Sequence, residues 1–200
     1  ELHQDIVKLN FQDGTAALLA IIMGDNIVLA NAGDQRAVLS RSGKAIPLTK
    51  DHRPDVPEEK ERIERDGGFV SENKRVDGVL ALSRALGDPE LHPHVSQHPD
   101  IILCEITADD EWLIMCCDGV WDVMDNDTAV SIVNSEKDPN KAAVKLRDYA
   151  HGLGSTDNIS VICFNLKQRH QAIHPGKPAL AKSLPKFLSM LHHRGEADPN

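Results

Sequence analysis

Four aspartates stand beside apolar stretches, where a carboxylate is held rigidly and partly removed from water. Asp34 and Asp118 come at the ends of two such stretches, and Asp157 comes just ahead of a third. Asp122 lies four residues after Asp118, so one helical turn between them would place both carboxylates on the same side. Removing a carboxylate from water costs free energy unless something cationic lies nearby, so the four residues together are a candidate cation site.

The residue types of this set indicate which cation it would bind. Carboxylate oxygens without His or Cys are hard ligands, which favour Mg²⁺ or Mn²⁺ over zinc. For one such aspartate taken alone, a role in capping a turn or a helix is favoured over metal binding by about two to one. The set of four shifts that balance and predicts a metal site formed by Asp118, Asp157, Asp34 and Asp122.

The elements that must hold these residues begin with short apolar runs separated by tight turns. Gly24-Asp25-Asn26, Gly33-Asp34 and Ser42-Gly43 are turn signals between successive runs. Runs of this kind predict an antiparallel meander. The first two runs alternate poorly between apolar and polar residues, which suits strands covered on both faces. The expected strands of this region are 15–23, 27–32, 36–40 and 44–48.

Helices and further strands follow the meander. Asp55 is expected to cap a highly charged helix over 58–65, with Pro57 in its first turn and Gly67-Gly68 at its end. Because tight turns link the strands, the predicted fold class is α+β with a mostly antiparallel sheet. The remaining expected elements are strands 100–106, 112–117 and 159–166, a helix over 127–135, and a longer helix from Pro139 to about Gly152 capped by Asp138.

The composition fits one globular domain and excludes some classes of partner. The chain has 200 residues, 40% of them hydrophobic, and a net charge of −9. That charge argues against a nucleic-acid backbone as a partner. No signal peptide and no apolar run long enough to cross a bilayer is found, so a membrane partner is not expected. The cysteines lack the spacing of a zinc site or a disulfide scaffold, which predicts reduced core thiols in a cytoplasmic or nuclear protein: Cys104, Cys116, Cys117 and Cys163.

The last 34 residues differ in character from the rest. Residues 167–200 hold six basic and two acidic residues, against 16 and 29 before them, and include four prolines. A domain boundary is therefore expected near Lys167. Within the extension, four leucines between 179 and 191 lie on one helical stripe that can dock on a partner or an acidic membrane surface. Pro185 weakens such a helix, so a flexible, disordered extension is the default interpretation.

Seven segments between Gly33 and Val161 stand out as motifs. They are Gly33-Asp34-Gln35-Arg36, Asp51-His52-Arg53-Pro54, Glu59-Lys60-Glu61-Arg62-Ile63, Gly67-Gly68, Ser83-Arg84-Ala85-Leu86-Gly87-Asp88, Cys117-Asp118-Gly119-Val120-Trp121-Asp122-Val123-Met124 and Gly154-Ser155-Thr156-Asp157-Asn158-Ile159-Ser160-Val161. In their order and approximate spacing they resemble type 2C metal-dependent protein serine/threonine phosphatases, and the resemblance runs from about Asp13 to Leu166. No single motif is specific, but jointly they are. Gln35 departs from the Ser usual at its position, and Asp13-Gly14-Thr15-Ala16 resembles a variant of the family's Gly-Ser-Thr-Ala stretch.

The resemblance implies a fold, an activity and a metal site. The fold is an antiparallel β-sandwich of two sheets flanked by helices, in four layers. The activity is hydrolysis of phosphoserine and phosphothreonine in phosphoprotein substrates by water activated between two Mg²⁺ or Mn²⁺ ions. Asp118 and Asp157 match ligands of that pair, and Asp34 and Asp122, with Asp118, match the positions that hold a third, weaker metal ion.

The family's Asp-Gly-His-Gly motif does not occur in these residues. None of the four Asp-Gly pairs, at 13, 66, 77 and 118, is followed by His. That motif supplies a bridging metal ligand, and an Arg upstream of it binds phosphate. We therefore expect 1–166 to be a catalytic domain incomplete at its N-terminus, assign no catalytic residue to it, and expect the chain alone to be inactive or impaired. The alternative is a catalytically dead pseudophosphatase or regulatory binding module.

Four further features are expected to have mainly structural roles. Arg84 is the best basic candidate near the site, with an ion pair to a carboxylate as the slightly favoured alternative. His52 is expected to pack or hydrogen-bond rather than catalyse. Residues 89–99 hold three histidines, which indicates a stiff substrate-side loop more than a metal cluster. The charged face of 58–65 is expected to be solvated.

Overall fold

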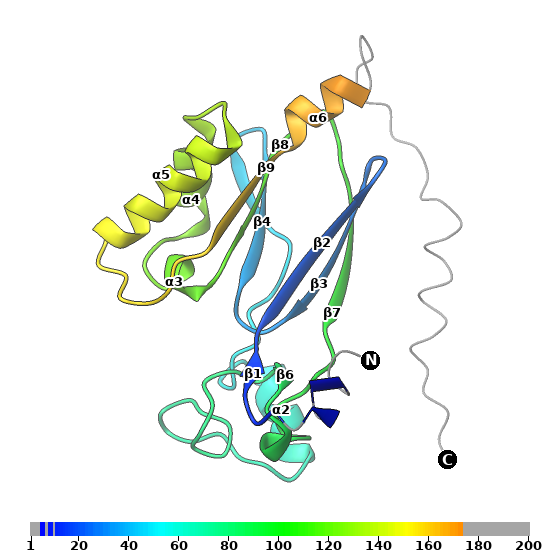
Figure 1. Ribbon diagram of the computed structural model, residues 1–200, viewed down its shortest axis with the longest axis vertical. Coiled ribbons are helices and arrows are strands. Elements are labelled where there is room, and N and C mark those ends of the chain that lie inside the picture. The colour runs from blue at the N-terminus through cyan, green and yellow to red at the C-terminus, as the bar shows by residue number, and fades with distance from the viewer. Residues whose placement is uncertain (1–4, 7, 10, 174–200) are drawn as a thin grey trace.

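The structure is a computed structural model that describes residues 5–6, 8–9 and 11–173. Two antiparallel sheets pack face to face, and a short two-stranded ladder lies beside them (Figure 1). The three-stranded sheet has the order β2 (Ala17–Met23), β3 (Asn26–Ala32), β7 (Asp100–Glu105). The four-stranded sheet has the order β5 (Lys44–Pro47), β4 (Arg36–Arg41), β8 (Asp110–Cys116), β9 (Val161–Asn165), and the ladder joins β1 (Gly14–Thr15) to β6 (Leu86–Gly87).

One hydrophobic core lies between the two sheets. Alternate residues of each strand point inward, so Ile27 and Leu29 of β3 meet Leu39 of β4 and Leu113 of β8, all of them excluded from solvent. This core fixes how the two sheets sit on each other, and with it the turns at their ends.

A second core lies between the four-stranded sheet and its helices. Helices α4 (Asn126–Asn134) and α5 (Pro139–Gly152) cover the outer face of that sheet, as Figure 1 shows. Trp112 and Ile114 of β8 pack there against Val130 and Leu146. The predicted cap of α5 is confirmed, since the Asp138 side chain accepts a hydrogen bond from the Lys141 N–H at 2.9 Å. Helix α3 (Asp118–Trp121) directly follows β8.

A small unit with its own core extends from one end of the sandwich. It contains α2 (Pro57–Arg65) and the one-turn helix η1 (Pro89–Leu91), and Ile63, Val76 and Val95 are buried inside it. The predicted cap of α2 is wrong. Val56 precedes the helix without a side-chain hydrogen bond, and Asp55 instead pairs with Lys74 at 2.8 Å.

The predicted single meander divides between the two sheets. Strands β2 and β3 pair in one sheet and β4 and β5 in the other, so the chain crosses between sheets at Gly33-Asp34. The expectation that the first strand is covered on both faces is also wrong. Leu19, Ile21 and Met23 of β2 are 44–56% exposed on the outer face of their sheet. No helix in the described part of the chain covers that face.

The predicted boundary at Lys167 falls inside a helix. Helix α6 (Leu166–Ile173) begins directly after β9, and its first residue, Leu166, is fully buried in the core between the sheets. The proposed docking stripe at 179–191 lies outside the described residues. Among the helices that are described, none is long and apolar enough to span a membrane. All four cysteines are free thiols.

Candidate metal centre

The four predicted aspartates gather at one end of the sandwich. Asp34 lies in the crossing between β3 and β4, Asp118 begins α3 at the end of β8, and Asp157 lies in the loop before β9. These turns are neighbours because β8 pairs with β4 on one side and with β9 on the other. Asp122 closes the single turn of α3, and its N–H donates to the Asp118 carbonyl at 2.8 Å. The structure thus brings together residues 123 positions apart in the chain.

Gly119 allows the two loops that carry Asp118 and Asp157 to touch. A Cβ at Gly119 would lie 2.3 Å from the Asn158 carbonyl oxygen, closer than any side chain can approach backbone. The Cys117 N–H donates to the Ser160 carbonyl at 3.2 Å and holds the same contact from the strand side. A glycine after Asp118 is therefore a requirement of this close approach.

The site has more negative charge than its surroundings balance. Burial, and then the nearby Asp118, raise the pKa of Asp34 to about 6. Burial, and then Asp157 and Asp122, raise the pKa of Asp118. Both carboxylates are thus disfavoured in their charged form, which is the state that a bound cation would stabilise.

The sequence prediction missed the basic residue of this site, which is Arg53. Its Nη2 donates to Oδ1 of Asp122 at 2.5 Å, and its Nε lies 3.9 Å from Oδ2 of Asp34. The only signal for it in the sequence is its place in the Asp51-His52-Arg53-Pro54 segment, which says nothing about which carboxylates it meets.

The four carboxylates lie in neighbouring turns, but their oxygens are not close enough together to coordinate one metal ion. Within 5–6, 8–9 and 11–173, no three His, Cys, Asp or Glu side chains are grouped so that they could hold a metal ion. Asp118 accepts a hydrogen bond from the Gly119 N–H at 2.9 Å, and Asp157 accepts one from the Asn158 N–H at 2.6 Å. The all-oxygen set and its excess negative charge fit a hard divalent cation as part of a shell that needs further ligands.

Arg84 is a structural residue here. It donates to the Glu59 carboxylate through Nε and Nη2, and to Asp100 at 2.7 Å. Glu59 is almost fully buried, so the charged face of α2 is not wholly solvated as predicted. The expectation for His52 is confirmed. Its buried ring lies 3.1 Å from Asp100 through Nε2, and its Nδ1 accepts from the Gly33 N–H at 3.2 Å.

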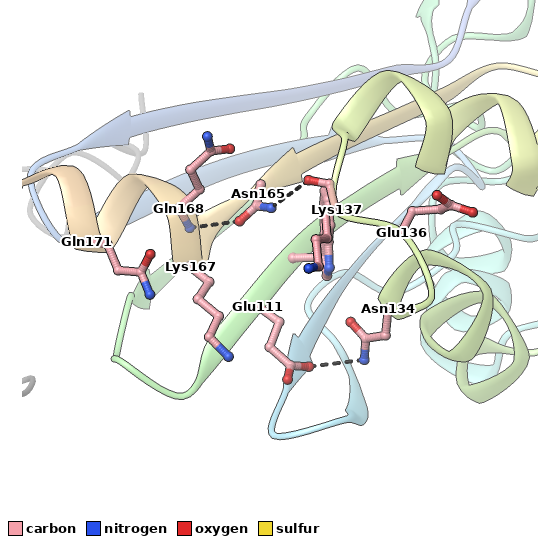
Figure 2. Close-up of a pocket in the computed structure, with 9 residues that line it drawn as sticks. Glu111, Asn134, Glu136, Lys137, Asn165, Lys167, Gln168 and Gln171 are labelled. Atoms are coloured by element: carbon pink, nitrogen blue, oxygen red, sulfur yellow. Dashed lines mark hydrogen bonds between the residues drawn. The ribbon is translucent and has the colours of Figure 1, made fainter.

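Two other places are not centres of this chemistry. In the histidine-rich loop, His94 pairs with Asp77 at 2.6 Å, and no metal cluster forms there among the described residues. A cavity of about 630 Å³ lies at the opposite end of β8 (Figure 2). Its polar lining mixes two acidic and two basic side chains with amides, and none of the four aspartates reaches it: Glu111, Asn134, Glu136, Lys137, Asn165, Lys167, Gln168 and Gln171.

Comparison with known proteins identifies the family and the fold of this chain. A family model described as "Protein phosphatase 2C" matches residues 2–159. "Probable protein phosphatase 2C 69" of Arabidopsis thaliana is 45% identical over 194 residues, which are 94% of this chain and 55% of that protein. The chain spans about half the length of the curated relatives it matches.

Two solved structures share the fold. The structure of a C. elegans sex determining protein aligns with a TM-score of 0.76 at 27% identity, covering 86% of this chain and 45% of that one. The serine-threonine phosphatase 2C from Toxoplasma gondii aligns with a TM-score of 0.69 at 25% identity, covering 80% and 61%. The predicted α+β fold of two antiparallel sheets with helices is confirmed. Because the family model matches residues 2–159, most of this chain, the chain belongs to the protein phosphatase 2C family.

Proposed function

We propose that this end of the sandwich is part of the metal centre of a protein serine/threonine phosphatase, which hydrolyses phosphoserine and phosphothreonine in phosphoproteins. The observation that carries the proposal is the convergence of Asp34, Asp118, Asp122 and Asp157 with too little positive charge around them. The family depends on Mg²⁺ or Mn²⁺, the hard cations that oxygen ligands prefer.

Each aspartate has a proposed role. Asp118 and Asp157 are ligands of the two main metal ions, and their loops are held in contact through Gly119. Asp34 and Asp122, with Asp118, hold a third and weaker ion. Such ions, when bound, make hydroxide available near neutral pH and neutralise phosphoryl oxygens. The described part of the chain holds the four carboxylates in place and keeps most of Asp34 away from solvent.

The 200 residues are proposed to be inactive, or nearly so, by themselves. They contain no Asp-Gly-His-Gly motif, so the ligand that bridges the two main ions in the family must come from elsewhere. Without it, this chain would hold the two metal ions poorly, and the activated water that they would supply for attack on phosphorus would be lacking. Metal binding by this chain alone should therefore be weak.

A second candidate function is a binding module without turnover. The observation in its favour is that no three described side chains are grouped to hold a metal ion. Such a module would recognise the partners or substrates of a phosphatase and would keep the fold without the chemistry. The carboxylates with raised pKa favour the first candidate, because a module without metal has no need to keep uncompensated charge.

The test is hydrolysis of a phosphothreonine peptide with Mn²⁺ by two proteins. One is the 200-residue chain. The other, the completed protein, is the same chain joined to an upstream segment of a type 2C phosphatase that contains the Asp-Gly-His-Gly motif. We expect background turnover from the first and metal-dependent turnover, abolished by EDTA, from the second.

Two results would contradict the proposal. A folded, completed protein without turnover at any Mn²⁺ concentration would favour the binding module. A 200-residue chain as active as the completed protein would mean that the essential ligands are already present and are wrongly assigned. Light scattering on both proteins controls for self-association, which the exposed apolar face of β2 favours.

A further inference from the structure

Arg53 contacts the candidate metal centre from two sides. Its guanidinium donates to Asp122 at the end of α3 and lies 3.9 Å from Asp34 in the crossing between the sheets. Its positive charge also acts on Asp118, where it partly offsets the effect of burial. The positively charged side chain of Arg53 thus lies among three of the carboxylates that are proposed to bind a divalent metal ion.

The neighbours of Arg53 hold it in this place. His52 is buried, and its own N–H donates to the Gly33 carbonyl at 3.0 Å while its ring accepts from the Gly33 N–H. Pro54 follows, and its ring restricts the backbone of the residue before it. Arg53 is therefore fixed against the turn that carries Asp34, and its approach to the carboxylates is built into the fold.

The pairing of Arg53 is nevertheless imperfect. Its Nε is enclosed by protein and makes no hydrogen bond to any residue in 5–6, 8–9 and 11–173. By contrast, Arg36 forms a two-pronged pair with Asp51, at 2.8 and 2.6 Å. A buried donor without an acceptor costs free energy, and the Arg53 contact with Asp34 at 3.9 Å is held by charge without a hydrogen bond, so Arg53 is less firmly paired here than Arg36 is with Asp51.

We propose that Arg53 is an intramolecular counter-ion that competes with divalent cations for Asp34 and Asp122. The inference rests on the proposed function insofar as it concerns the same carboxylates. A guanidinium and a metal ion bound to the same two carboxylates would repel each other and would compete for the same oxygen lone pairs. A cation that binds these two aspartates must displace Arg53, which lowers the apparent affinity of that position and makes it the weakest of the centre.

The experiment is a Mn²⁺ titration of the 200-residue chain, followed by the electron paramagnetic resonance signal of free Mn²⁺. Arg53→Gln removes the competing charge and should tighten Mn²⁺ binding by about tenfold or more. Arg147→Gln is the matched control, because Arg147 is an exposed residue of α5 whose partner is the adjacent Asp148. It should leave the affinity unchanged. Adding Asp122→Asn to Arg53→Gln should abolish the gain.

Thermal unfolding gives a second readout. In EDTA, Arg53→Gln should melt below the wild-type chain, since Asp34 and Asp122 lose their counter-ion. Added Mn²⁺ should raise its melting temperature more than that of the wild type. If Arg53→Gln does not fold, Arg53→Met keeps the apolar stem of the side chain and should show the same gain.

The outcomes separate this inference from the proposed function. If the Mn²⁺ affinity of Arg53→Gln is within twofold of wild type while Asp118→Asn still weakens Mn²⁺ binding, the competition is overturned and the metal centre stands. Absence of Mn²⁺ binding in both wild type and Arg53→Gln would overturn the metal assignment and the inference with it.

Discussion

The two ends of strand β8 carry carboxylates in opposite situations. At its beginning, Asp110 is fully buried and receives hydrogen bonds from both the guanidinium of Arg41 and the N–H and hydroxyl of Thr107. Burial alone would raise the pKa of the next residue, Glu111, but hydrogen bonds from Ser40, Gly43 and Asn134 lower it. Every charge at this end has donors, so these carboxylates stabilise the fold.

The other end of β8 has fewer donors for its carboxylates. Asp118 receives one hydrogen bond from the Gly119 N–H, and its neighbours Asp122 and Asp157 are also acidic. Burial and these charges raise its pKa instead of lowering it. The comparison shows that burial alone does not separate these two kinds of carboxylate. The supply of hydrogen-bond donors around them does, and the shortage at Asp118 is the reason for proposing it as a metal ligand.

The largest expected difference between the two ends is in activity. In the completed protein, Asp118→Asn should lower the turnover of a phosphothreonine peptide by about a thousandfold, because it removes a ligand charge. Asp110→Asn should leave turnover intact but lower the free energy of unfolding by about 3 kcal/mol, because it leaves Arg41 partly unpaired. Steady-state kinetics and urea unfolding measure the two effects. Equal losses of turnover in both variants, at a temperature where both are folded, would erase the distinction.

Glu59 extends the comparison to a third buried carboxylate. Burial would raise its pKa, but the hydrogen bonds from Arg84 and the positive charges of Arg84 and Arg62 lower it to about 2. Its stabilising effect is therefore complete above about pH 4.5 and is lost as the pH falls toward 2. At pH 7, Glu59→Gln should cost about 3 kcal/mol.

Urea unfolding against pH checks this prediction. The difference in stability between wild type and Glu59→Gln should shrink as the pH falls from about 4.5 to 2. Glu58→Gln, at the exposed neighbouring position, should show no such difference. A pH-independent effect of Glu59→Gln would mean that lost packing, and not charge, explains the variant.

Gly119→Ala should weaken the metal centre without removing a ligand. Its new Cβ would collide with the Asn158 carbonyl and push the Asp118 and Asp157 loops apart. We expect Mn²⁺ binding by the completed protein to weaken by about tenfold. Gly152→Ala, in open space at the end of α5, is the control and should bind as wild type does. Calorimetry compares the two, and an unchanged affinity in Gly119→Ala would mean that the loops do not need this contact.

The smallest expected effect is a gain in stability. Asp34 is charged at pH 7 although burial and Asp118 disfavour its charged form. Asp34→Asn keeps the shape of the side chain and should raise the stability of the metal-free chain by about 1 kcal/mol, while a structural carboxylate such as Asp110 should give the opposite sign. Thermal unfolding in EDTA measures it. A loss of stability would show that the pairing of Asp34 with Arg53 outweighs its burial.

The sequence predicted which aspartates form the candidate site, but not which hydrogen-bond donors surround them. Asp34, Asp118 and Asp157 were identifiable because an apolar run beside an acidic residue is a local pattern. Their partners are not local. Arg41 lies 69 positions from Asp110, and Arg53 lies 69 positions from Asp122, so the donors that separate the two ends of β8 become visible only in the fold.

The same reason explains the errors in the fold. Gly33-Asp34 gives the signal of a tight turn whether the chain returns to the same sheet or crosses to the other one, and the long-range pairing of β4 with β8 decides between them. Likewise, Asp55 has the spacing of a helix cap, but Lys74 offers it an ion pair from another part of the small unit.

The most direct test of the central claim is Mn²⁺ binding to the 200-residue chain and to the variants at the two ends of β8, measured by equilibrium titration. The account predicts that wild type and Asp110→Asn bind Mn²⁺ with the same affinity, and that Asp118→Asn binds at least about tenfold more weakly. If Asp118→Asn binds Mn²⁺ as wild type does, or if folded Asp110→Asn loses binding to the same extent, the carboxylates at this end are not the metal ligands.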